Sequence, residues 1–263
     1  MKVGIIGYGA MGAALRETLE EGGAKIVAAL GREASLETAK AALPDDVTVT
    51  ADFAAFAATR PDVMVECAGH EGLRQHGPRA LAAGFDLVIA SVGALADAPT
   101  EAALREAAAK GGRLVIPAGA LAGLDALSAA RRAGLDEVRY VSRKAPRAWR
   151  GTAAETMVDL DGVTAPTIFF EGTAREAALA FPQNANVVAA ASLAGLGFDA
   201  TQVALMADPT VTGNRHLLEA RGAFGELSIS VLARTLPANP KTSWLAPLSL
   251  ARAVLNLHER VVV

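Results

Sequence analysis

The chain has 263 residues, of which 52% are hydrophobic and 20% are charged, and its formal net charge is −3. This composition supports a full hydrophobic core and excludes a disordered chain. The length suits one large domain or two modest ones. A slightly acidic balance without a basic run argues against nucleic acid as a partner.

The cysteine count and the lengths of the apolar segments indicate where in the cell the protein works. The single cysteine, Cys67, cannot form an intrachain disulfide, so we expect a reducing cytoplasm. The first apolar run, 3–6, is too short for a signal peptide, and stretches such as 87–95 are far too short to span a membrane. The four histidines and one cysteine show no metal-ligand spacing, so we predict no metal site.

Strand-like and helix-like segments alternate through the first part of the chain. We predict strands at 3–6, 25–30, 47–50, 62–66, 85–90 and 113–116, with helices at 10–21, 35–43, 71–83 and 101–110. Thr100 is the expected N-cap of the last of these helices. Such alternation with continuously apolar strands predicts a parallel sheet that is covered on both faces.

Gly7, Gly9 and Gly12 follow the first strand at G-x-G-x-x-G spacing. Gly7 permits a tight turn, Gly9 lets the backbone approach a pyrophosphate, and Gly12 lets the helix pack closely on the strand. Ala10 and Met11 lie at the positive end of that helix, where free N–H groups attract an anion. We therefore predict that this loop binds a nucleotide cofactor.

The pattern changes near Pro117. Strands are expected at 137–143, 167–171, 203–205 and 227–231, helices at 122–133 and 184–196, and a hairpin turn at Arg221–Gly222. The predicted fold class is α/β: a Rossmann dinucleotide-binding domain (1–118), then an α+β substrate and catalytic domain (119–240) with a mainly antiparallel sheet. A C-terminal helix (241–263) is expected to pack back on the first domain through Trp244, Leu248, Ala251 and Leu255, which share one face.

The end of the second strand bears on cofactor choice. NAD enzymes of this kind carry an acidic residue there that bonds the ribose, whereas this chain has Gly31 followed by Arg32. A guanidinium matches a 2′-phosphate, so we predict that NADP is accepted alongside NAD, and preferred. The alternative is that Arg32 is a solvated surface charge.

Small residues follow the later strands of the first domain. They lie in the segments 66–69, 91–94 and 117–120, and in open α/β sheets ligands bind outside these carboxyl ends. We therefore expect Cys67 and Ala68 to line the cofactor. For Cys67 the alternative is a small buried residue, which is the common state of a free cysteine.

Several longer motifs resemble one known family. The segments GYGAMG, VECAG, PAGALAGLDAL, FPQNANVVAAASLAG, DPTVTGNRH and NPKTSWLAPLS look like those of the L-aspartate dehydrogenase family, and the likeness covers about residues 2–256. It implies a Rossmann domain joined to a domain like that of homoserine dehydrogenase and dihydrodipicolinate reductase. It also implies NAD(P)-dependent oxidation of L-aspartate to iminoaspartate, which is hydrolysed to oxaloacetate and ammonia or feeds NAD biosynthesis.

The resemblance also assigns residues. It places cofactor contacts at Ala120 and Asn186, and the active-site histidine at His216. The departure is at Gly31–Arg32, where many members have an acidic residue. This difference affects the choice between NAD and NADP and leaves the reaction unchanged.

His216 also stands out from the strand pattern. Asn214, His216 and Leu218 would point to one face of a strand, towards the cofactor cleft. Imidazole titrates near neutrality and suits proton transfer, either from the substrate amine or in activating the water that hydrolyses the imine. The sequence leaves this choice open. His70, His76 and His258 are expected to be solvated or internally satisfied.

A substrate with two carboxylates needs cationic or N–H-rich partners. The candidates are Lys144, Asn184 with the N–H groups that begin its helix, and Lys241 and Thr242 before the last helix. For each, the alternative is an ordinary cap or surface charge. We expect a homodimer that pairs through the second sheet. The competing functions are a related reductase, of the dihydrodipicolinate reductase or homoserine dehydrogenase type, and a non-catalytic NAD(P) sensor.

Overall fold

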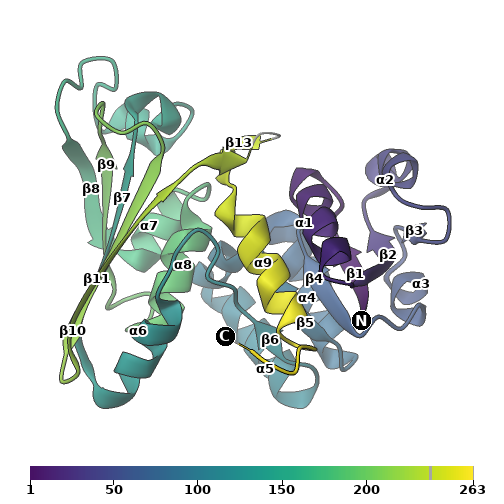
Figure 1. The fold of residues 1–263 in the computed structure, drawn as a ribbon. Helices are drawn as coiled ribbons and strands as arrows, with labels where there is room; N and C mark the ends of the chain where they lie inside the picture. The colour runs from purple at the N-terminus through teal and green to yellow at the C-terminus, as the bar shows by residue number, and fades with distance from the viewer. Residues whose placement is uncertain (237–238, 263) are drawn as a thin grey trace. The chain divides into compact units, whose positions relative to one another are not determined.

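The computed structural model describes residues 1–236 and 239–262, without the side chains of 239–241. The chain divides into two compact units. Unit 1 comprises Met1–Pro117 and Pro247–Val263, and unit 2 comprises Ala118–Ala246. Figure 1 follows the chain from the purple strands of unit 1 through unit 2 to the yellow helix that returns to unit 1.

Unit 1 contains a six-stranded sheet in which all neighbouring strands are parallel, as predicted. Its strands are β1 (Lys2–Ile6), β2 (Lys25–Leu30), β3 (Thr48–Thr50), β4 (Val63–Glu66), β5 (Asp86–Ile89) and β6 (Leu114–Val115). Their order is β3-β2-β1-β4-β5-β6. The order reverses between β1 and β4, and such a switch point creates a crevice at the carboxyl ends of the strands.

The helices of unit 1 connect these strands. They are α1 (Ala10–Glu21), α2 (Leu36–Ala42), α3 (Phe53–Ala58), α4 (Gly69–Ala82) and α5 (Ala98–Lys110), with short 3₁₀ turns η1 (Glu33–Ser35) and η2 (Val92–Ala96). The prediction that Thr100 caps α5 is wrong. The cap is Asp97, whose carboxylate accepts a hydrogen bond from the Thr100 N–H at 3.1 Å. Pro99 then falls in the first turn, where a missing N–H costs nothing.

The last helix, α9 (Leu245–Leu255), adds its buried face to the core of unit 1. Leu250, Ala251 and Val254 join the cluster that contains Val3 and Ile5 of β1. The predicted contact face is only partly right. Trp244 and Leu248 are 47% and 41% exposed. The buried stripe is displaced by one position and consists of Pro247, Leu250, Ala251 and Val254.

The segment before α9 is extended. The strand β13 (Asn239–Ser243) pairs antiparallel with β12 (Thr235–Leu236), so the prediction of a helix from residue 241 is wrong. Strand pairing satisfies the backbone of this segment, and the β-branched Thr242 is suited to it. Pro247 then lies in the first turn of α9, where proline is tolerated.

Unit 2 contains a five-stranded sheet in the order β11-β10-β7-β9-β8. Its strands are β7 (Leu135–Lys144), β8 (Thr167–Thr173), β9 (Gln202–Ala207), β10 (Asn214–Gly222) and β11 (Gly225–Ala233). Only β7 and β9 run parallel, so the expected, mainly antiparallel sheet is confirmed. The predicted hairpin turn is misplaced by two residues, because Gly222 pairs with Gly225 and the turn is Ala223–Phe224.

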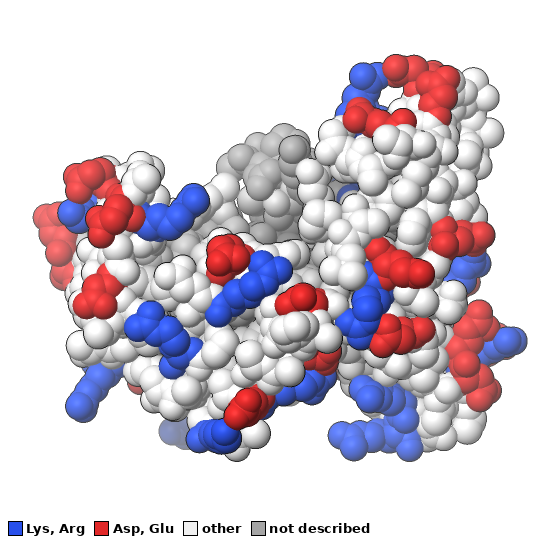
Figure 2. Space-filling model, turned by 180° about the vertical axis from the view of Figure 1, so that it is seen from behind, with Lys and Arg blue, Asp and Glu red and all other residues white. Residues whose placement is uncertain are grey.

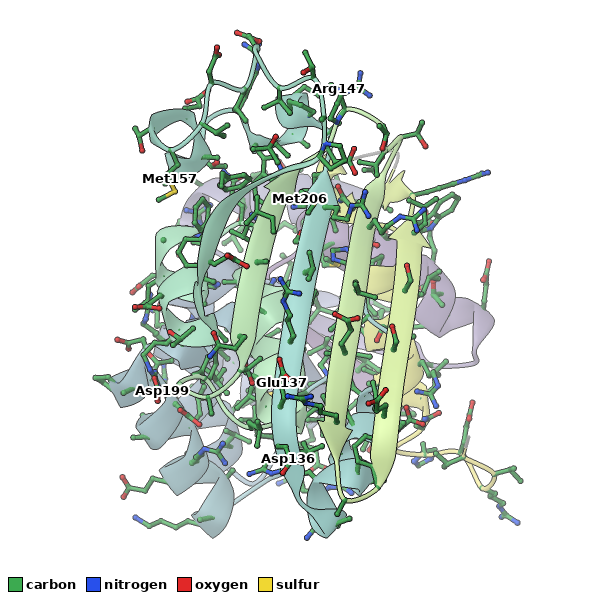
Figure 3. All side chains as sticks on the ribbon, turned by 90° about the vertical axis from the view of Figure 1, so that its left-hand side faces the viewer. Asp136, Glu137, Arg147, Met157, Asp199 and Met206 are labelled. Atoms are coloured by element: carbon green, nitrogen blue, oxygen red, sulfur yellow. The ribbon has the colours of Figure 1, made fainter. Side chains whose placement is uncertain are left out.

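Three helices cover one face of this sheet: α6 (Leu124–Ala130), α7 (Ala174–Ala180) and α8 (Ala185–Ala194). Three further 3₁₀ turns are η3 (Arg131–Ala133), η4 (Pro146–Trp149) and η5 (Ala153–Thr156). Figure 3 shows the opposite face of the sheet, with no helix in front of β7, β10 and β11. Within the described parts of the chain, no helix combines the length and the apolar character that crossing a membrane requires.

Candidate active site

The glycine-rich turn between β1 and α1 is shaped by close backbone packing. Gly7 has a φ of 90°, and a Cβ at this position would lie 2.5 Å from the backbone of Ala68. A Cβ on Gly12 would lie 2.9 Å from the Gly7 carbonyl oxygen. Gly9 differs, because nothing lies within 4 Å of the place where its Cβ would be. Gly7 and Gly12 therefore build the turn, whereas Gly9 leaves open space for a ligand.

The N-terminus of α1 is free to receive an anion. Gly9 is its N-cap and provides no side-chain hydrogen bond, and its first turn contains no acidic residue. Ala10 and Met11 begin the helix, where the N–H groups and the helix dipole attract negative charge. The residues of this turn fit the pyrophosphate of a dinucleotide.

The N-terminus of α4 is already occupied by a carboxylate of the chain. Glu66, at the end of β4, is fully buried, and its Oε1 accepts hydrogen bonds from the N–H groups of Ala68 at 2.7 Å and Gly69 at 2.9 Å. Both of its oxygens also bond Ser91, after β5. Burial raises the pKa of Glu66 against the effect of these bonds. Glu66 therefore ties two strand ends together at the crevice.

Cys67 and Ala68 follow directly. Ala68 is exposed, and Cys67 is half-buried against the core of unit 1. Burial raises the pKa of the Cys67 thiol well above its ordinary value, and the Glu66 carboxylate adds to the shift. A thiol with a raised pKa is a poor nucleophile, which leaves Cys67 a packing or lining role.

Arg32 is exposed, as the residue between β2 and η1. Its carbonyl accepts hydrogen bonds from the N–H and hydroxyl of Ser35, both at 2.8 Å. Among the described residues, no carboxylate forms an ion pair with its guanidinium. Ser35 therefore holds the backbone of this loop, and the Arg32 side chain is left able to bind a ligand.

His216 is the third residue of β10 and is only 3% exposed. Its Nδ1 is 2.7 Å from the hydroxyl of Tyr140 on β7, and the two rings stack at 6.0 Å. Burial lowers the pKa of His216 to about 3, and the positive charge of Lys144 contributes. Burial raises the pKa of Tyr140, which keeps its proton. The imidazole is therefore neutral at physiological pH, with Nε2 as its remaining polar atom.

Lys144 ends β7 on the same face as Tyr140 and Ser142, and Ser142 pairs with His216 across the sheet. Its Nζ donates a hydrogen bond to Oδ1 of Asn184 and lies 4.9 Å from the centre of the Trp149 ring. Burial lowers the pKa of Lys144 to about 8. Within the part of the chain that the structure describes, no carboxylate pairs with this amine.

The side chain of Asn184 does not act as a helix cap, which is the alternative to a substrate contact. It is buried and turned to Lys144, and it forms no capping bond to α8. Asparagine is a common cap, but here the amide oxygen instead compensates a half-buried ammonium.

A pocket of about 360 Å³ opens beside these groups, entirely within unit 2. Its polar lining residues are Lys144, Arg147, Arg150, Gln183, Asn184, Thr212, Asn214 and Thr235. It contains three basic side chains and no acidic one, so its chemistry favours an anion. Arg147 lies beyond the end of β7, at the opposite end of the sheet from Asp136 (Figure 3).

The remaining predicted site residues, where the structure describes them, do not line this pocket. Ala120 is buried in the loop that opens unit 2, and Asn186 is exposed on α8. Thr242 is half-buried in β13, and the side chain of Lys241 lies outside the described residues. The described residues contain no group of three or more potential metal ligands.

Sequence reasoning missed three members of the site. These are Tyr140, Arg147 and Arg150. Tyr140 had an available signal, since it alternates with Ser142 and Lys144 in a half-buried strand. The two arginines had none, because their positions depend on the turn η4 after that strand.

A parallel sheet with an open pyrophosphate turn, joined to a sheet with a buried histidine beside an anion pocket, defines a nicotinamide-dependent oxidoreductase. Two family models match the chain: "Homoserine dehydrogenase, NAD binding domain" over residues 4–117 and "Aspartate dehydrogenase, C-terminal" over residues 125–257. The chain belongs to the L-aspartate dehydrogenase family.

Relatives extend this assignment over the whole length. The L-aspartate dehydrogenase of Acinetobacter baumannii is 42% identical, over 100% of this chain and 99% of its own. That of Cupriavidus necator is 44% identical over 100% of both. The crystal structure of aspartate dehydrogenase from Thermotoga maritima superposes with a TM-score of 0.77 at 26% identity, covering 100% of this chain and 99% of that one.

Proposed function

We propose that this chain oxidises L-aspartate to iminoaspartate with NADP or NAD, and that iminoaspartate is then hydrolysed to oxaloacetate and ammonia. The reverse reductive amination uses the same groups. The observation that carries the proposal is the basic pocket lined by Lys144, whose positive charge acts on the buried His216. A dicarboxylic amino acid is an anion that such a pocket attracts. The bound nicotinamide supplies the hydride acceptor.

The proposed substrate ligands are Lys144, Asn184, Lys241 and Thr242, which orient Cα for hydride transfer. His216 is the proposed catalytic residue. Its neutral imidazole has Nδ1 engaged by Tyr140, so Nε2 takes the proton, either from the substrate amine or from the hydrolytic water.

The proposed cofactor ligands lie around the crevice of unit 1 and at two points of unit 2. Gly7, Gly9, Ala10, Met11 and Gly12 hold the pyrophosphate, and Arg32 holds the 2′-phosphate of NADP. The remaining contacts are Cys67, Ala68, Ala120 and Asn186. The support is the open space at Gly9, the start of α1 without a side-chain cap, and the exposed guanidinium of Arg32, which no described carboxylate pairs with.

We further propose a homodimer formed through the open face of the unit 2 sheet. This face carries Met206, labelled in Figure 3, and two exposed apolar side chains, Ile168 (41%) and Leu232 (54%). A second copy related by a two-fold axis would cover the same strip on both subunits. Sedimentation of the wild type and of Leu232→Asp tests this.

The proposed setting is the cytoplasm, with iminoaspartate supplied to pyridine-nucleotide biosynthesis. Its support is the single cysteine, which is half-buried and has a raised thiol pKa. Figure 2 shows acidic and basic side chains interspersed over one face of the molecule, a distribution typical of an enzyme with a small-molecule substrate.

The deciding experiment is a steady-state screen of amino acids with NAD and NADP in parallel. We expect reduced cofactor to accumulate with L-aspartate. His216→Ala should lower kcat by about 100-fold or more while cofactor binding is retained. Turnover of another substrate would favour a related reductase, and cofactor binding without any turnover would favour a sensor.

A further inference from the structure

The two ends of the basic pocket of unit 2 differ in their residues and exposure. Its inner end is marked by Lys144, which lies near enough to His216 for its charge to lower the imidazole pKa. Its outer end is marked by Arg147, which is exposed beyond the end of β7 (Figure 3). A substrate that reacts beside His216 therefore extends its remaining atoms toward the outer end.

The basic groups at the outer end are not equivalent. Arg150 forms an ion pair with Asp161. Arg143 is the neighbour of Lys144 on the other face of β7 and does not line the pocket; it is paired with the buried Asp208, which also accepts the Thr210 N–H at 2.8 Å. Arg147 differs from both: across the described chain, no acidic side chain forms an ion pair with it. It is the guanidinium at this end whose charge remains uncompensated.

We infer that Arg147 binds the side-chain carboxylate of the substrate and so selects a dicarboxylic amino acid over its amide or alkyl analogues. The inference rests on the proposed function and deepens it. A guanidinium can hold a carboxylate through two parallel hydrogen bonds, whereas an amide or methyl group offers it no matching pair of acceptors. Lys144 and Asn184, at the inner end, are left to the carboxylate next to Cα.

The test compares L-aspartate with L-asparagine. Arg147→Met keeps the length of the side chain and removes its charge. We expect kcat/KM for L-aspartate to fall by about 10- to 100-fold, mainly through KM, because a hydrogen-bonded charge pair is lost. Turnover of L-asparagine should change less than about 3-fold. Arg147→Lys should recover part of the loss, since charge returns without the two-pronged geometry.

Two variants serve as controls. Arg132→Met removes an exposed charge from η3, outside the pocket, and should leave kcat/KM for both substrates unchanged. Arg150→Met removes the guanidinium that is paired with Asp161, and it should lower kcat/KM for L-aspartate less than Arg147→Met does. The inference is overturned if Arg147→Met lowers kcat/KM for both substrates equally or has no effect on either. It is also overturned if Arg150→Met, and not Arg147→Met, causes the loss of kcat/KM that is specific to aspartate.

Calorimetry with succinate separates this inference from the proposed function. Succinate has two carboxylates and no amine, so its binding needs no turnover. We expect Arg147→Met to weaken it about 10-fold or more, with an unchanged melting temperature. If the wild type binds succinate through Arg147 but oxidises no aspartate, the proposed function fails and the pocket assignment stands. If aspartate is oxidised but Arg147→Met does not weaken succinate binding, the proposed function stands and the role assigned to Arg147 fails.

Discussion

The hydroxyl of Tyr140 lies 2.7 Å from Nδ1 of His216, and both side chains are buried. Because the pKa of Tyr140 is raised and that of His216 is lowered, a protonated phenol meets a neutral imidazole. For Nε2 to act as the base, Nδ1 carries the ring proton and donates it to the phenol oxygen, and this hydrogen bond also fixes the plane of the ring. Such partners of catalytic histidines set both tautomer and orientation.

Tyr140→Phe removes this hydroxyl while keeping the ring that stacks on His216. We expect kcat to fall about 10-fold with little change in KM or in cofactor affinity, because the imidazole loses its orientation and not its place. Steady-state kinetics with a melting curve checks this. An unchanged kcat would show that packing alone orients His216.

The imidazole of His216 should remain neutral throughout the physiological range. Burial and the Lys144 charge lower its pKa to about 3, so it gains a proton only in strong acid. In a sample labelled at histidine Cε1, the resonance lost in His216→Asn should not move between pH 5 and 8. A sigmoidal shift of that resonance centred near 6.5 would contradict the assigned environment.

Gly7 and Gly9 form a matched pair for separating fold from ligand binding. Gly9→Ala meets no neighbour, so its melting temperature should be unchanged while the Kd for either cofactor rises about 10-fold or more. Gly7→Ala has a positive φ and a clash with Ala68, so it should lose about 1–3 kcal/mol of stability or more. Equal effects of the two variants on stability would refute this division.

Arg32→Ala tests the choice of cofactor. We expect kcat/KM with NADP to fall about 10-fold or more and that with NAD to change little, because only NADP has the 2′-phosphate that a guanidinium grips. Kinetics with both cofactors on one preparation supplies the internal control. If NADP use is untouched, Arg32 is a surface charge.

Lys144 predicts a pH dependence for anion binding. Its pKa is lowered to about 8, so the ammonium is present below pH 8 and lost above it, whereas an exposed lysine stays charged to about pH 10.4. Succinate affinity should therefore fall as the pH rises from about 7.5 to 9. In Lys144→Arg the decline should vanish, since a guanidinium stays charged. Persistence of the decline in that variant would assign it to another group.

Local patterns account for the parts of the fold that the sequence predicted correctly. The strands of unit 1 are short apolar runs, and the glycine spacing of the first turn needs no distant residue to be recognised. The period-2 alternation of β10 placed His216 and Leu218 on one face, and both are buried.

The errors lie where tertiary contacts compete with local signals. The cap of α5 is a local exception: Asp97, three residues before Thr100, accepts the Thr100 N–H and starts the helix earlier. Residues 239–243 became a strand because β12 offers a partner, and α9 therefore begins only at Leu245. Propensity alone does not weigh such contacts.

By itself the sequence determined the nucleotide turn, the parallel sheet and the identity of His216 as a candidate, since these depend on spacing along the chain. Only the tertiary structure decided what surrounds that histidine. Tyr140 and His216 are 76 residues apart, and Lys144 and Asn184 are 40 apart. The register of β7 against β10 and the approach of α8 join these pairs and bury them. Burial in turn sets their charge, because the pKa of a side chain depends on its surroundings as well as on its type.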